Sequence, residues 1–142
     1  MRRLRKLTRF FQLSRTERRM LLRVLLVVGV ARGALLTLPM QRARRLVAKV
    51  ASGSAGDSVQ RVVWAVKAVS SCLPGATCLT QALAAEALLT HAGLSPQIEI
   101  GVAKDKLSGF QAHAWVVCHG QVVLGGQQLE RYNPLIIWNR QE

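Results

Sequence analysis

Hydrophobic residues before Pro39 recur at intervals of three and four, the spacing of one helix face. The leucines between positions 21 and 26 follow Ser14-Arg-Thr-Glu17, which has the spacing of a capping box. This pattern predicts a basic amphipathic helix that ends by about Pro39, with a second short basic stretch behind it. Only uncharged residues separate Arg23 from Arg32, but that stretch is far shorter than the roughly 20 residues of a membrane span. We therefore expect neither a span nor a signal peptide.

Two further helices are predicted in the middle of the chain. Valines at positions 59, 62, 63, 66 and 69 form an apolar stripe, and Asp57 or Ser58 precedes it as a cap. The second helix is expected to begin at Cys78, with Thr77 as its cap, and to stop at Gly93.

Alternating apolar residues predict three strands after these helices, over 97–102, 111–118 and 121–124. His119-Gly120 predicts a tight turn between the second and third strands, and Gly125-Gly126 loosens the chain before the tail. Helices followed by a small antiparallel sheet are typical of an α+β fold.

The net charge of +13 belongs entirely to residues 1–50. This segment holds fourteen of the twenty Lys and Arg residues and a single acid, whereas bases and acids balance over residues 51–142. The small-residue stretch 51–56 separates them, so we expect a basic helical region, 1–50, and a neutral domain, 51–142. A basic segment of this kind favours an acidic partner, an anionic lipid surface or phosphate. The low aromatic content, 5%, argues against nucleic acid as the partner.

The cysteines indicate a reducing compartment, because three is an odd number and does not suit a disulfide framework. We expect a cytoplasmic protein, with peripheral membrane contact through residues 1–50 as an added option. Neither paired Cys or His spacing nor a glycine-rich phosphate loop is present, so no metal and no cofactor is predicted.

Cys78 and His113 are the candidates for chemistry. The unpaired N–H groups and the dipole at a helix start favour a negatively charged sulfur at Cys78. His113 lies in a predicted strand between two alanines, which leave room beside its imidazole. A helix-start Cys followed by a strand-borne His is the order found in papain-like and transglutaminase-like enzymes. Taken alone, the same residues also fit a buried structural cysteine and a core histidine.

The surrounding sequence resembles the lasso-peptide biosynthesis B protein, in its leader-peptidase half, which is related to transglutaminase-like cysteine proteases. The motifs that carry the resemblance are Pro74-Gly-Ala-Thr-Cys78-Leu-Thr-Gln-Ala-Leu, Gly101-Val, Ala112-His-Ala-Trp-Val116, Gly120 to Gly126, Tyr132-Asn-Pro-Leu135 and the opening Leu13 to Arg18. The resemblance covers most of the chain and implies a papain/transglutaminase-like core.

The resemblance also implies a reaction. Family members remove the leader from a ribosomally made precursor peptide, and an ATP-dependent, asparagine-synthetase-like cyclase then closes the macrolactam. Cys78 would be the nucleophile, its backbone N–H the oxyanion donor, and His113 the base. A separate protein recognises the leader in split systems, so the implied partners are precursor, recognition protein and cyclase.

One departure from the family concerns the third catalytic residue. The family places an Asp after the His, whereas this chain has no Asp after Asp105. Glu130 is the first candidate because it is charged, Gln128 the next and Asn133 a further one. Asp105 precedes the His and fits less well. The missing Asp also leaves open an alternative, a non-catalytic scaffold of the same fold.

Two tryptophans complete the expectations. Trp115 shares the parity of His113 along the strand, so it either walls the site and contacts substrate or belongs to the core. Trp64, on the valine-rich helix, is expected in the core.

Overall fold

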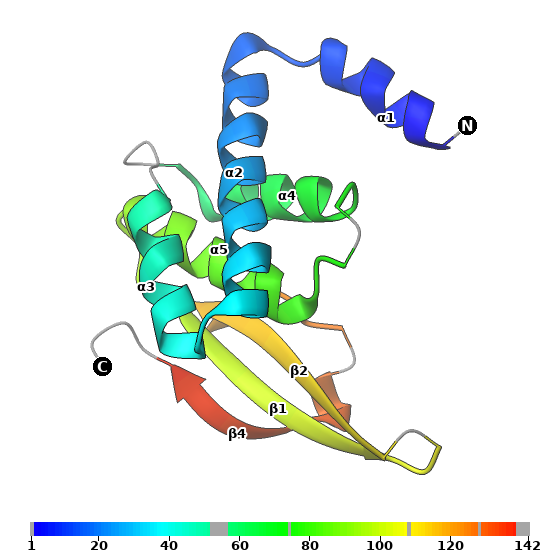
Figure 1. The fold of residues 1–142 in the computed structure, drawn as a ribbon, viewed down its shortest axis with the longest axis vertical. Coiled ribbons are helices and arrows are strands. Elements are labelled where there is room, and N and C mark those ends of the chain that lie inside the picture. Colours follow the sequence, from blue (N-terminus) through cyan, green and yellow to red (C-terminus); the bar gives the residue numbers. More distant parts are fainter. Residues whose placement is uncertain (1, 52–56, 74, 108, 128, 139–142) are drawn as a thin grey trace.

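The computed structural model describes residues 2–51, 57–73, 75–107, 109–127 and 129–138 and shows helices followed by an antiparallel sheet (Figure 1). The helices are α1 (Arg2–Phe11), α2 (Arg15–Thr37), α3 (Met40–Val50), α4 (Val59–Ser70) and α5 (Cys78–His91). The strands are β1 (Gln97–Asp105), β2 (Gly109–Cys118), β3 (Gln121–Leu124) and β4 (Asn133–Trp138), with a short 3₁₀ helix η1 (Leu129–Arg131) before β4. The predicted α+β class is confirmed.

The helix starts are fixed by the capping residues that the sequence indicates. Ser14 and Glu17 form a complete capping box at α2, because each side chain accepts a hydrogen bond from the other residue's main-chain N–H. Ser58 caps α4 by accepting from the N–H of Arg61. Thr77 caps α5 in the same way, so Cys78 is the first residue of that helix.

The sheet has the order β3-β2-β1-β4, and all of its pairs are antiparallel. In the long β1–β2 ladder Gly101 faces His113 and Glu99 faces Trp115. β3 is short and pairs only with positions 116–118 of β2. Positions 109–115 of β2 therefore have β1 on one side and, within the described ranges, no strand on the other.

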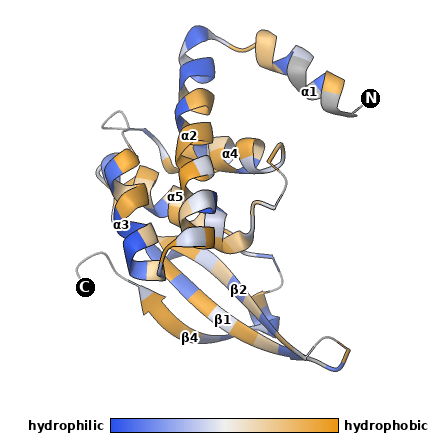
Figure 2. Ribbon diagram, in the orientation of Figure 1, coloured by the Kyte–Doolittle hydropathy of each residue, from blue (hydrophilic) through white to orange (hydrophobic). Residues whose placement is uncertain are grey.

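One hydrophobic core lies between the helices and one face of the sheet. It includes Val24, Val28 and Val47 as well as Val66 and Val116, so it draws side chains from both sides of residue 50. Helices α2 and α3 pack against each other and against α5. Figure 2 shows hydrophobic residues gathered along α2, α4 and α5 and hydrophilic ones on α3. The expected linker, 51–56, lies outside the described residues except for the buried Ala51.

The N-terminal helix α1 stands away from this body (Figure 1). It is tied to the start of α2 by Arg18, whose guanidinium donates to the main-chain carbonyls of Phe11 and Leu13. Phe10 packs against the edge of the core, whereas Leu4 and Phe11 are exposed.

Helix α2 is long and apolar enough to cross a membrane by length and composition alone. The sequence-based argument against a span counted only the uncharged stretch between Arg23 and Arg32, whereas the whole helix, Arg15–Thr37, has the length and hydropathy of a possible span. In this structure one face of α2 packs in the core through residues such as Val27 and Ala31, while Leu22, Leu26 and Leu36 are exposed.

Candidate active site

Cys78 occupies the position that the sequence predicts, at the capped start of α5. The Thr77 hydroxyl accepts from the N–H of Thr80 at 3.3 Å and lies 3.0 Å from the Thr80 hydroxyl. Cys78 itself is half-buried and packs against the core. The first N–H groups of a helix have no intrahelical partner, so they are available to a sulfur anion or to an oxyanion beside it.

His113 is half-buried in the middle of β2 and has a defined partner. Its Nε2 lies 2.7 Å from the main-chain oxygen of Gly125, just beyond the end of β3. The imidazole also has two aromatic neighbours, with its centroid 5.1 Å from that of Tyr132 and 6.1 Å from that of Trp115. The ring is thus held by one hydrogen bond and two aromatic neighbours.

Trp115 is buried beside His113, on the same face of β2. Its indole N–H donates to the Glu99 carboxylate at 2.7 Å, so its polar atom is satisfied. The ring lies over Gly101, where an added Cβ would stand only 2.7 Å from the indole. Trp115 is thus a buried neighbour of the imidazole, and its 3% exposure is compatible with both sequence-based interpretations, a wall of the site and a core residue. Trp64, expected in the core, is instead 43% exposed on α4.

Cys78 and His113 do not share a hydrogen bond in this structure, among the residues described. Strand alternation puts His113 and Trp115 on one face of β2, and Ala114 and Val116, which belong to the core beneath the helices, on the other. A proton transfer between Cys78 and His113 requires the two groups to approach. Cys78 packs against that core, so the structure does not bring these two predicted catalytic residues together.

None of the candidates for a third residue is hydrogen-bonded to His113 among the described positions. Glu130 is exposed on η1, and Asn133 is exposed at the start of β4. Gln128 lies outside the described residues. The acceptor actually present, the Gly125 carbonyl, could not be inferred from side-chain chemistry, because any residue carries a main-chain carbonyl.

The other two cysteines have different surroundings. Cys72 is exposed after the end of α4. Cys118 is buried at the end of β2, and this burial raises the pKa of its thiol, although hydrogen bonds from the main chain at Ser95 and His119 act the other way. Cys78, half-buried at a helix start, lies between these two extremes of exposure.

The family comparison agrees with this architecture. A model of the transglutaminase-like superfamily matches residues 20–137, which includes most of α2, all of α3 to α5 and nearly all of the sheet. The chain belongs to the transglutaminase-like superfamily. Comparison with curated protein sequences and with solved structures gave no match.

Proposed function

We propose that this protein is a cysteine peptidase that removes the leader from a ribosomally made lasso-peptide precursor, before a partner cyclase closes the macrolactam. The observation that carries the proposal is the position of Cys78, the first residue of a capped helix in a chain of the transglutaminase-like superfamily. The motifs around Cys78 and His113 supply the more specific part, because they resemble those of the lasso-peptide leader peptidase.

The proposed reaction uses Cys78 and His113 in two stages. After a rearrangement that brings the imidazole to the sulfur, His113 takes the Cys78 thiol proton, and the sulfur attacks the scissile carbonyl, with the Cys78 main-chain N–H supporting the oxyanion. The C–N bond then breaks as His113 gives that proton to the leaving amine, which is the new α-amine of the core peptide. Water, deprotonated by the same imidazole, hydrolyses the thioester and releases the leader as an acid.

The direct test is cleavage of the precursor peptide in the presence of its recognition protein and cyclase, followed by mass spectrometry. We expect Cys78→Ala to abolish release of the leader, because no other group replaces the nucleophile. Cys72→Ala is the matched control, since it removes an exposed thiol close by in sequence and should leave cleavage unchanged. Normal leader release by Cys78→Ala would overturn the peptidase proposal.

The alternative is a non-catalytic scaffold of the same fold in the biosynthetic complex. The observation that favours it is the absence of a carboxylate on His113 among the described residues. A scaffold would support processing equally well as wild type and as Cys78→Ala, so the same experiment separates the two functions.

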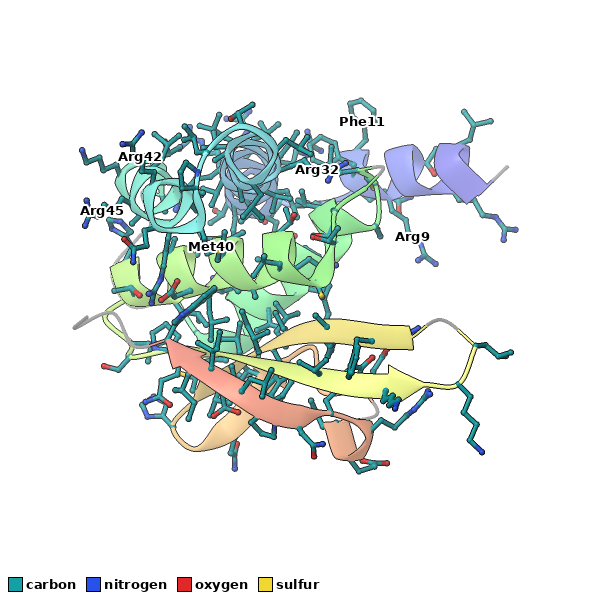
Figure 3. The ribbon with its side chains drawn as sticks, turned by 60° about the horizontal axis from the view of Figure 1, so that its bottom comes forward. Arg9, Phe11, Arg32, Met40, Arg42 and Arg45 are labelled. Carbon is teal, nitrogen blue, oxygen red and sulfur yellow. The ribbon has the colours of Figure 1, made fainter. Side chains whose placement is uncertain are left out.

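Residues 1–50 are proposed to dock the processing complex. Figure 3 shows Arg42 and Arg45 pointing outward from α3, and Arg9 and Phe11 standing out on α1. These cations occur beside exposed apolar side chains and almost without acids, which suits an acidic surface on the recognition protein or cyclase. The same features would also suit an anionic membrane surface, so the experiment on this region must distinguish membrane binding from protein binding.

A further inference from the structure

One arginine of the N-terminal segment lies against the loop that leads to Cys78. Arg32 is half-buried on α2, and Figure 3 shows its side chain on the opposite side of this helix from Arg42 and Arg45. A Cβ added to Gly75 would stand only 2.5 Å from Nη2 of Arg32 and 3.1 Å from its Nε, so the guanidinium covers that glycine. Helix α2 therefore places a cation on the chain three residues before the proposed nucleophile.

The contact depends on residue 75 having no side chain. Gly75 has a φ of +78°, a left-handed conformation that other residues rarely adopt, and the guanidinium fills the space where a side chain would begin. Two residues later Thr77 caps α5 by accepting from the N–H of Thr80. The loop under Arg32 is thus joined directly to the fixed start of the helix that carries Cys78.

The Arg32 guanidinium has no partner in the part of the chain that the structure describes, neither a hydrogen-bond acceptor nor an acid. Two other half-buried arginines of the same segment do have partners. Arg18 donates to main-chain carbonyls, and Arg44 pairs with the carboxylate of Glu86. A guanidinium that has lost part of its hydration is best satisfied by a carboxylate, because two of its N–H groups can bond to the two oxygens together. Arg32 is therefore suited to an acid from a bound molecule.

The length of chain between Gly75 and Cys78 sets where that acid would come from. Consecutive Cα atoms are about 3.8 Å apart, so these two residues are separated by no more than about 11 Å. An extended peptide advances by about 3.3 Å per residue. A peptide bound with its scissile carbonyl at the Cys78 sulfur therefore brings to Arg32 a side chain within about four residues of the cleaved bond.

We propose that Arg32 is a specificity-determining residue, which binds the carboxylate of an Asp or Glu side chain within about four residues of the scissile bond of the peptide substrate. This inference rests on the proposed function, since it assigns a contact of the peptide that Cys78 cleaves. The guanidinium holds the carboxylate through paired N–H donors, and Gly75 leaves it the room to lie beside the loop. Arg32 transfers no proton, so its contribution falls on substrate binding.

The first test combines changes in the enzyme and in the precursor peptide. Each Asp or Glu near the cleaved bond is replaced in turn by Asn or Gln, and the kcat and KM of leader release are measured by mass spectrometry with the recognition protein present. We expect one such replacement to lower the kcat/KM of the wild type by about 10-fold, mainly through KM, the scale of a hydrogen bond to a charged group. Arg32→Gln should show the same loss on the unaltered precursor and no further loss when the two changes are combined.

Arg61→Gln is the matched control, because Arg61 is exposed on α4 and its loss should leave both kinetic constants unchanged. Losses that simply add in the combined experiment would overturn the inference, since independent sites do not share an interaction. A precursor without an acidic residue in this stretch would overturn it as well.

The second test separates recognition from a structural role. Arg32→Glu should cleave a precursor that carries Lys in place of the recognised acid better than the unaltered precursor, a rescue that loss of packing cannot produce. Gly75→Ala should displace the guanidinium and raise KM, whereas Gly93→Ala, also at positive φ, +89°, meets nothing within 4 Å and should not. Absence of the rescue, with Cys78→Ala inactive, would overturn the role of Arg32 alone. Leader release by Cys78→Ala would instead overturn the proposed function.

Discussion

The guanidinium of Arg44 on α3 pairs with the carboxylate of Glu86 on α5. Its Nε lies 3.1 Å and 3.0 Å from the two carboxylate oxygens, and Glu86 is only 3% exposed. The same guanidinium stands 5.8 Å from the centre of the Trp138 ring at the end of β4. A single, half-buried arginine from the basic N-terminal segment thus joins three elements of the fold.

Arg44→Ala should destabilise the protein strongly. It leaves the buried Glu86 carboxylate without its cation, and breaking a buried pair costs about 3 kcal/mol or more. Arg45→Ala is the control, since Arg45 is exposed on the same helix and its loss should change the free energy of unfolding by less than about 0.5 kcal/mol. Urea denaturation of the three proteins measures the difference. Equal stability of the two variants would mean that the pair is not maintained in solution.

The three cysteines should react with iodoacetamide in a fixed order. We expect Cys118 to stay unlabelled in the folded protein, because it is buried and the pKa of its thiol is raised by that burial. The raised pKa favours the protonated thiol and burial keeps the reagent away from it, so labelling should appear only after denaturation. Cys72, exposed, should react like a free thiol.

Cys78 should react faster than Cys72 at neutral pH despite being less exposed, because the start of α5 supports the thiolate. Peptide mapping by mass spectrometry at several times gives all three rates in one sample. His113→Ala should slow Cys78 and leave Cys72 unchanged if His113 is its base. Slower labelling of Cys78 than of Cys72 in the wild type would exclude an activated resting nucleophile.

The Trp115–Glu99 hydrogen bond predicts a difference between two substitutions of Glu99. Glu99→Gln keeps an oxygen acceptor for the indole N–H, whereas Glu99→Leu leaves that buried donor without a partner. We expect Glu99→Leu to lower the free energy of unfolding by about 1–3 kcal/mol and Glu99→Gln by clearly less. Equal losses would show that the acceptor oxygen is not what matters at Glu99. Tryptophan fluorescence during urea unfolding records both.

Much of the fold was accessible from the sequence, because it is specified locally. The helix starts at Arg15, Val59 and Cys78 follow from side chains one residue before them, and those caps are present. The predicted strands match β1, β2 and β3 closely, since alternation reports which face is buried.

Neither the strand β4 nor the exposure of Trp64 could be predicted from the sequence in this way. β4 shows no alternation to detect, because Leu135, Ile136 and Ile137 are all exposed on an edge strand. Trp64 lies outside the stripe of valines that α4 buries, and only the packing of α4 shows that its ring stays exposed.

The candidate site divides along the same line. Cys78 at a helix start and His113 in a strand follow from spacing and capping. Their placement relative to each other does not, because it depends on which face of β2 packs against the helices. A search for a third residue among carboxylates and amides leads to Glu130 or Gln128. The group that holds His113 is a main-chain carbonyl, and its sequence signal is a glycine.

The last prediction concerns α1, of whose described side chains only Phe10 packs against the core. Deleting residues 1–50 would remove Val24, Val28 and Val47 from the core, so loss of activity in that variant would report unfolding. Deleting residues 1–12 keeps the capping box of α2 and removes the helix that stands away from the body. We expect the shorter deletion to leave Cys78 alkylation unchanged and to slow leader release in the complete mixture by about 10-fold at low salt.

Arg5→Glu with Arg9→Glu keeps the helix, reverses two exposed charges and should give the same loss if charge carries the docking. Sedimentation with vesicles that contain anionic lipid distinguishes the two partners. If the wild type binds the vesicles and both variants do not, the partner is a membrane surface, and docking to an acidic protein is overturned. Unchanged processing by the truncated chain would exclude a docking role for α1 altogether.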